Sequence, residues 1–166
     1  MKNSITNLQG YTLQENLFLS NVAEVKISYS TKIKASERRS ITSSRDADEV
    51  LRMVWDLNTI EYIESMKIIL LNRSNKLLGI GNISTGGTSS CLVDAKVVFQ
   101  YAIKANSSAI LLAHNHPSGN LKPSDQDLAI TKKINEGAKL LDILLIDHLI
   151  ITAYDGYYSM ADEGVL

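Results

Sequence analysis

Two of the chain's three histidines, His114 and His116, stand one residue apart, and Asp127 follows after a loop that contains Pro117 and Pro123. Side chains alternate along a strand, so both imidazoles would project to one side, with Cα atoms ~6.5–7 Å apart. Two imidazoles and a carboxylate supply three ligands to tetrahedral zinc and leave the fourth position to water, as in catalytic sites. The sequence therefore predicts one Zn²⁺ per chain, held by His114, His116 and Asp127.

Each part of this pattern also has a structural explanation. Ser124-x-x-Asp127 matches a helix-capping pattern, and an aspartate is favoured in a first helical turn by the helix dipole. His-x-His pairs also occur on surfaces without any metal. The combination favours a metal site, because the histidines directly follow the apolar segment Ala109–Ala113, where loops at strand ends commonly build sites.

Apolar periodicity predicts the elements that position these residues. A first helix is expected over Arg45–Asp56, with Ser44 as its N-cap and with four residues inward: Ala47, Val50, Leu51 and Val54. A second helix is expected after the N-cap Asp94, with an apolar stripe of Val97, Val98, Tyr101, Ala102 and Ala105. A third is expected over Ser124–Leu141, with Leu128, Thr131, Ile134, Ala138 and Leu141 inward. Strands are expected over Met66–Leu71, Lys76–Ile83, Ala109–Ala113 and Leu144–Thr152, with a loop over Ser84–Ser90. This alternation predicts an α/β (α+β) mixed sheet with helices on its faces.

The first 42 residues are polar and weakly patterned, and they are interpreted as an N-terminal extension with one strand, Val22–Tyr29. Residues 43–166 are predicted to form the single domain. Basic residues gather near the junction, at Lys26, Lys32, Lys34, Arg38 and Arg39. A solvated arm is the favoured interpretation, and an arm that binds a partner or DNA is the alternative.

Composition excludes several classes of protein. The 166 residues are 45% hydrophobic and 21% charged with a net charge of -1, which is typical of a globular domain and gives no global positive field for nucleic acid. Cys91 is the only cysteine, so an internal disulfide and a cysteine zinc cage are excluded. The first residues lack the apolar core of a signal peptide, and no run is long enough to span a bilayer. We therefore expect a cytoplasmic protein without a membrane partner.

Other metal and nucleotide chemistries lack their motifs. The loop with Gly86 and Gly87 does not have the phosphate-loop spacing, and neither H-E-x-x-H nor the H-x-E and P-C-x-x-C pair of deaminases is present. The adjacent letters His-Asn-His do not form an HNH nuclease motif, which is spread over a ββα unit. An Fe(II) oxygenase is disfavoured because its ligands usually come in the order H-x-D/E and then a distant histidine.

The segment His114-Asn-His-Pro-Ser-Gly119, followed by Pro123-Ser124-x-x-Asp127, resembles the signature of the JAMM (MPN-plus) metallohydrolases, and in particular their RadC-like branch. The resemblance extends from about Ser43 to the C-terminus. It implies a cytidine-deaminase-like three-layer MPN/JAB fold, a zinc-bound water and a glutamate general base at the start of the first core strand. It also implies that the ligands are the three residues already named.

The base position falls on Glu64, directly before the apolar strand, with Glu61 as its rival. A carboxylate within hydrogen-bond reach of the zinc water must take its proton and pass it to the leaving group. Ser124 would donate a hydrogen bond to the oxyanion or the water in addition to capping.

Two further polar residues have open roles. His148 lies in an apolar strand, where a satisfied core histidine is favoured and a hydrogen-bond partner of a zinc ligand is the alternative. Asn115 would point away from the two histidines and hydrogen-bond a neighbouring loop.

The resemblance leads to a zinc-dependent hydrolase of the metallopeptidase type, acting on an amide or isopeptide bond of a protein or peptide. Wider relatives cleave isopeptide bonds to ubiquitin-like tags, although nothing in this sequence identifies that substrate. The alternatives are a DNA repair-associated, nucleic-acid-binding factor and a non-catalytic zinc scaffold. Residues 1–42 show no helix-hairpin-helix module of the kind that usually precedes RadC-like domains, which disfavours DNA binding. The oligomeric state is not predicted.

Overall fold

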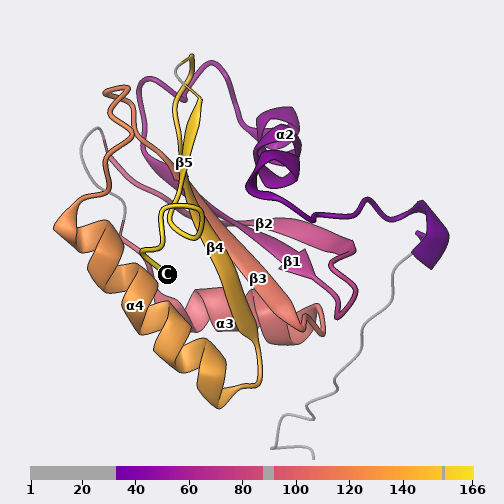
Figure 1. Cartoon of the computed structure of the whole chain (residues 1–166). Coiled ribbons are helices and arrows are strands. Elements are labelled where there is room, and N and C mark those ends of the chain that lie inside the picture. Colours follow the sequence, from indigo (N-terminus) through magenta and orange to yellow (C-terminus); the bar gives the residue numbers. More distant parts are fainter. Residues whose placement is uncertain (1–32, 88–91, 155) are drawn as a thin grey trace, which may run out of the picture.

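Five strands form one mixed sheet within residues 33–87, 92–154 and 156–166, the parts of the chain that the computed structural model describes (Figure 1). The strands are β1 (Ser65–Leu71), β2 (Leu77–Thr85), β3 (Ala109–Asn115), β4 (Leu144–Ile151) and β5 (Tyr157–Ser159). Their spatial order is β2-β1-β3-β4-β5. The predicted strand Val22–Tyr29, which contains Lys26, lies outside the described residues, and so does Lys32.

Strand directions bring the histidine segment next to the start of β1. β1 runs antiparallel to both β2 and β3, whereas β3 and β4 are parallel. A parallel pair needs a crossover, and helix α4 (Asp125–Leu140) provides it. His114 is consequently paired with Met66 of β1 on one side and with Ile150 of β4 on the other.

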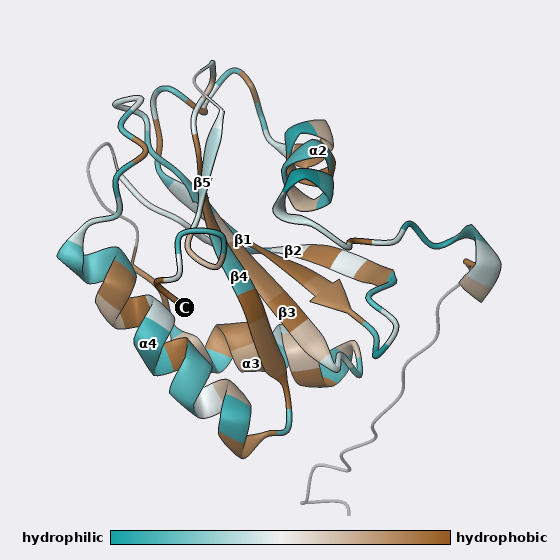
Figure 2. Ribbon diagram, viewed as in Figure 1, coloured by the Kyte–Doolittle hydropathy of each residue, from teal (hydrophilic) through white to brown (hydrophobic). Residues whose placement is uncertain are grey.

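Helices cover both faces of the sheet. α2 (Ser44–Val54) lies on one face, whereas α3 (Ala95–Lys104) and α4 lie on the other (Figure 1); a short 3₁₀ helix, η1 (Ala35–Glu37), precedes them. Strands β1, β3 and β4 are hydrophobic along much of their length, whereas hydrophilic and hydrophobic bands alternate along α4 (Figure 2). The expected three-layer, mixed α/β fold is therefore confirmed. Within the described ranges, no helix is long and apolar enough to cross a membrane.

The start of α2 differs from the prediction. Ser43, not Ser44, is the N-cap, because only Ser43 has an aspartate three residues later: its hydroxyl accepts from the Asp46 N–H at 3.1 Å, and the Asp46 carboxylate accepts from the Ser43 N–H. Ser44 instead bonds Tyr157 at 3.0 Å through its hydroxyl. The prediction that Val54 points inward is also wrong, since it is 45% exposed in the last turn.

Two other boundaries also differ. β2 continues past Ile83 to Thr85, which is paired with Ser65, so the predicted loop at Ser84 begins later. Leu141 is not part of the inward face of α4: it is the C-cap and is 43% exposed.

Tyr101 was predicted in the inward stripe of the helix that is now α3. It is 37% exposed, and its ring lies over Gly81 rather than in the core.

Candidate metal centre

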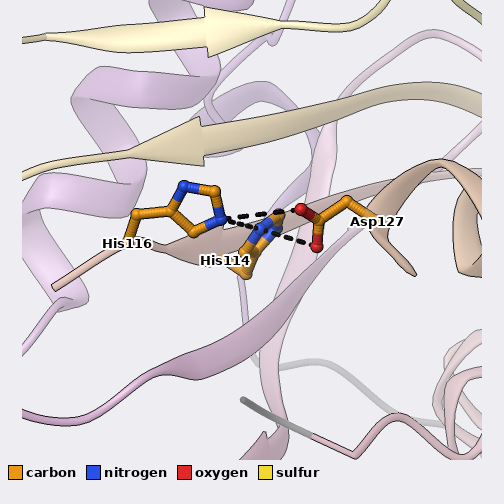
Figure 3. Close-up of side chains that lie close together, drawn as sticks. All are labelled: His114, His116 and Asp127. Carbon is orange, nitrogen blue, oxygen red and sulfur yellow. Dashed lines mark hydrogen bonds and ion pairs between the residues drawn. The ribbon is translucent and has the colours of Figure 1, made fainter. Parts of the chain in front are cut away.

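Three predicted ligands converge where β3 ends and α4 begins. His114 is buried at the end of β3, His116 follows the strand, and Asp127 is in the first turn of α4. Figure 3 shows both imidazoles and the carboxylate pointing toward one another. Nε2 of His114 lies 3.0 Å from Nε2 of His116 and 3.1 Å from Oδ1 of Asp127, and Nε2 of His116 lies 3.6 Å from Oδ2 of Asp127.

These separations fit a tetrahedral cation. With metal–ligand bonds near 2.0–2.1 Å, two ligand atoms of a tetrahedral zinc ion are ~3.3 Å apart. The nearest separations between the three side chains are close to this value, with His114 nearest to Oδ1 and His116 nearest to Oδ2 of Asp127. Among the described residues, these three form the group of histidine and carboxylate side chains that could hold a metal ion. The donor set, two nitrogens and one oxygen, suits a borderline-soft divalent cation.

The loop after His116 fixes which of its nitrogens is available. Nδ1 of His116 is 2.6 Å from the carbonyl oxygen of Asn120, and a carbonyl can only accept, so Nδ1 donates. Nε2 is therefore the nitrogen that faces His114 and Asp127, and it is the one available to a cation. Sequence reasoning did not identify Asn120, because a backbone acceptor carries no signal in the residue type.

Asp127 serves the helix and the site at once. Its Oδ2 accepts from the Ser124 N–H at 2.7 Å and from the Ser124 hydroxyl at 2.6 Å, while Oδ1 faces His114. The capping explanation therefore holds, and the same side chain could also serve as a ligand. The hydroxyl of Ser124 donates to Asp127 in this structure, and its donation to an oxyanion or a bound water stays a prediction.

Charge coupling at the site is strong. Burial acts to raise the pKa of Asp127, but hydrogen bonds from His114 and His116 and the Coulombic effect of His114 outweigh it and hold that pKa well below its usual range. The hydrogen bond to Asp127 raises the pKa of His116 against the effect of burial. The carboxylate is thus ionised at neutral pH and favours a cation between the rings.

His148 contacts a predicted ligand, as the alternative interpretation expected. It is completely buried, with Nε2 2.8 Å from Nδ1 of His114 and Nδ1 2.5 Å from Oγ1 of Thr131. Desolvation lowers the pKa of His148 well below its usual range, so the ring is neutral. The role of Thr131 was missed, although its position four residues after Asp127 puts both on one helix face.

Asn115 faces the opposite side of β3 and holds the segment that contains Glu64. Its amide group donates to the carbonyls of Ile60 and Ile63 at 2.6 and 2.9 Å, and its Oδ1 accepts from the Ser65 N–H at 2.8 Å. The predicted hydrogen bonds to a neighbouring loop are confirmed. Because residues 63 and 65 flank Glu64, this amide fixes the backbone of Glu64 relative to the histidines.

Glu64 lines a groove of about 800 Å³ together with His116 and Asp127. Its backbone pairs with the segment that follows β2: the Glu64 N–H donates to the Gly87 carbonyl, and the Gly86 N–H donates to the Glu64 carbonyl. Its charge contributes to the raised pKa of His116. Glu61, the rival residue, is exposed and is not part of this lining.

Comparison with known proteins identifies the family. Residues 41–165 match the family described as RadC-like JAB domain. A "UPF0758 protein" of Porphyromonas gingivalis is 43% identical over 129 residues, covering 78% of this chain and 56% of the relative. One of Flavobacterium johnsoniae is 39% identical over 127 residues, covering 76% and 54%. The chain thus spans about half the length of these curated relatives, and it belongs to the RadC-like JAB domain family.

Proposed function

We propose that this domain is a zinc-dependent hydrolase of the metallopeptidase type that cleaves an amide or isopeptide bond. His114, His116 and Asp127 are the proposed zinc ligands, with Glu64 as general base and Ser124 as a hydrogen-bond donor to the substrate oxygen. The observation that carries the proposal is the convergence of two imidazoles and a carboxylate, with nearest separations of 3.0, 3.1 and 3.6 Å, beside a groove that Glu64 also lines.

A zinc ion at these ligands would lower the pKa of a water molecule and polarise the carbonyl of the scissile bond. The carboxylate of Glu64 accepts the proton that the water loses as its oxygen bonds to the carbonyl carbon. Glu64 then delivers that proton to the amine nitrogen as the carbon–nitrogen bond breaks, so the products are a carboxylic acid and an amine. The backbone pairing of Glu64 and the Asn115 amide hold the base at the groove.

Ser124 can serve the substrate without loss of the helix cap. Its hydroxyl donates to Asp127 here, yet Oδ2 of Asp127 also accepts from the Ser124 N–H, so the carboxylate keeps one donor if the hydroxyl turns away. In the proposed reaction, the hydroxyl turns toward the carbonyl oxygen as negative charge develops there.

The lining of the groove supports a protein or peptide substrate. Beside the polar residues of the site it contains apolar side chains, among them Met66, Val93 and Ile130, together with Leu92, which is 90% exposed. A polar centre with apolar walls suits a peptide segment, whose backbone needs polar partners and whose side chains need apolar contact.

Metal analysis of the purified chain tests the site directly. We expect about one zinc per chain in the wild type and its loss in a His114→Ala, His116→Ala double variant. A wild type without zinc, or a double variant that retains it, would show that the proposed site is wrong.

Turnover separates an enzyme from a zinc scaffold. With a fluorogenic library of amide- and isopeptide-linked peptides, Glu64→Gln should lower the rate by roughly 10²–10⁴-fold while zinc is retained. Glu61→Gln is the matched control, since Glu61 is exposed and outside the groove lining, and it should match the wild type. Hydrolysis by the wild type that Glu64→Gln leaves unchanged would contradict the assigned base.

Nucleic-acid binding finds less support in the basic segment. Of its described residues, Arg39 lies 2.5 Å from Glu49, and Lys34 lies 3.9 Å from Glu37. Both cations are therefore partly neutralised by neighbouring carboxylates, and no second function is proposed.

A further inference from the structure

A hydrogen-bonded chain of buried groups joins two of the proposed ligands from behind. It runs from Nδ1 of His114 to Nε2 of His148 at 2.8 Å, and from Nδ1 of His148 to Oγ1 of Thr131 at 2.5 Å. The Thr131 hydroxyl then meets the carbonyl oxygen of Asp127 at 2.5 Å. We call these four groups the relay; it connects β3, β4 and α4 and begins and ends on ligand residues.

The last acceptor fixes every proton position in the relay. The Asp127 carbonyl can only accept, so the single hydroxyl proton of Thr131 must point to it. Oγ1 of Thr131 therefore accepts from His148, so Nδ1 of His148 carries a proton. A completely buried imidazole with no carboxylate in contact among the described residues holds one proton rather than two, so Nε2 of His148 is the acceptor and Nδ1 of His114 is the donor.

The geometry points to His148 and Thr131 as positioning residues that set the tautomer of His114, so that its Nε2 lone pair faces the cation site. The inference rests on the proposed function, because it assumes that His114 is a metal ligand. Oriented imidazole ligands commonly donate their second N–H to a fixed acceptor, and here that acceptor is itself held by a threonine on the ligand-bearing helix.

Burial makes each hydrogen bond of the relay costly to lose. His148 is 0% exposed and Thr131 is 4% exposed, so water is not available to replace a missing partner. If His148 carried its proton on Nε2, it would donate to His114, whose proton would then sit on Nε2 between the ligands. When each ring carries a single proton, the relay excludes that arrangement.

Proton positions can be measured on the wild-type chain. Two-bond ¹H–¹⁵N correlations at pH 8, in the metal-free and zinc-loaded protein, report which ring nitrogen is protonated. We expect Nδ1–H for both His148 and His114 in both states, the tautomer that free histidine disfavours in water. A proton on Nε2 of His148 would overturn the relay without any variant having to fold.

A matched pair of variants tests the effect on metal binding. Thr131→Val removes the hydroxyl at nearly constant shape and should weaken zinc binding roughly 10- to 100-fold in a chelator competition, with a change in the His148 correlations. Thr131→Ser keeps the hydroxyl and should restore both properties. Unchanged zinc affinity in Thr131→Val would overturn the positioning role.

The two proposals fail in different ways. If the wild type binds no zinc, the proposed function is wrong, and the proton position on His148 still decides whether the relay exists. If the wild type binds zinc and Thr131→Val binds it equally, the metal site stands and the relay is wrong.

Discussion

Two Ser-x-x-Asp capping boxes begin two helices on opposite faces of the sheet, Ser43 with Asp46 at α2 and Ser124 with Asp127 at α4. In each box, Oδ2 of the aspartate accepts the backbone N–H of the serine, at 3.1 and 2.7 Å. The two boxes differ in the second carboxylate oxygen of the aspartate, because at α4 Oδ1 of Asp127 lies 3.1 Å from Nε2 of His114. The hydrogen bonds that lower the pKa of Asp46 come instead from its own turn.

The comparison teaches that the motif builds a helix start and the surroundings give it chemistry. A carboxylate has two oxygens, and capping needs only one of them. At α4 the end of β3 brings His114 to the second oxygen and His116 to within 3.6 Å of the capping oxygen, because the parallel pairing of β3 with β4 requires α4 to cross back over the sheet. Among the described residues, Asp46 of the α2 box is not part of a group of side chains that could hold a metal ion.

The largest expected difference between the boxes concerns the charge of the aspartate. Asp127→Asn keeps an oxygen for the cap but supplies a neutral, weak ligand, so zinc affinity should fall by more than the ~100-fold upper range of outer-shell substitutions. Asp46→Asn makes the same change at the other box and should leave zinc affinity unchanged. Chelator competition with both purified variants measures this, and equal losses would contradict the division of roles.

Removing the serine hydroxyls tests what the boxes share. Ser43→Ala and Ser124→Ala should each destabilise the domain by about 1 kcal/mol, the usual cost of a lost N-cap, in urea unfolding of the metal-free chain. Only Ser124→Ala should also weaken zinc binding, by roughly tenfold, because its hydroxyl orients the Asp127 carboxylate. A zinc effect from Ser43→Ala would show that helix stability alone controls the site.

Much of the difference between the two capping boxes could be predicted from the sequence, but part of it could not. His-x-His at the end of an apolar strand and Ser-x-x-Asp at a helix start are local patterns, so the ligand group and its elements were predictable. Ser43 was identifiable as the N-cap too, since Asp46 follows at the required spacing. The contact of His148 with His114 was expected only as an alternative, because it depends on the β3–β4 register, which includes an irregularity between Ile110 and Leu111.

The packing of α4 against α3 is the next property to test. A Cβ at Gly137 would lie 2.8 Å from two ring atoms of Phe99 on α3, so Gly137→Ala should destabilise the domain by about 1 kcal/mol net, after its gain in helix propensity. Gly87→Ala is the control, since a Cβ there meets nothing within 4 Å. Urea unfolding compares them, and a Gly137→Ala variant as stable as the control would mean that Phe99 moves aside freely.

The smallest expected effect is the dependence of stability on acidic pH at the α2 capping box, which contains Asp46. Hydrogen bonds from the Thr42 N–H and hydroxyl lower the pKa of Asp46 below 3.8 against weak desolvation. A carboxyl with a lowered folded-state pKa contributes stability that is complete above its unfolded pKa and is lost as the pH falls through its folded pKa. The stability advantage of the wild type over Asp46→Asn should therefore be constant from pH 7 to about 5 and shrink below pH 4. Urea midpoints of both proteins across this range measure the difference, in which the other carboxyls cancel; an advantage that grows toward acid would reverse the sign and contradict the role of Thr42.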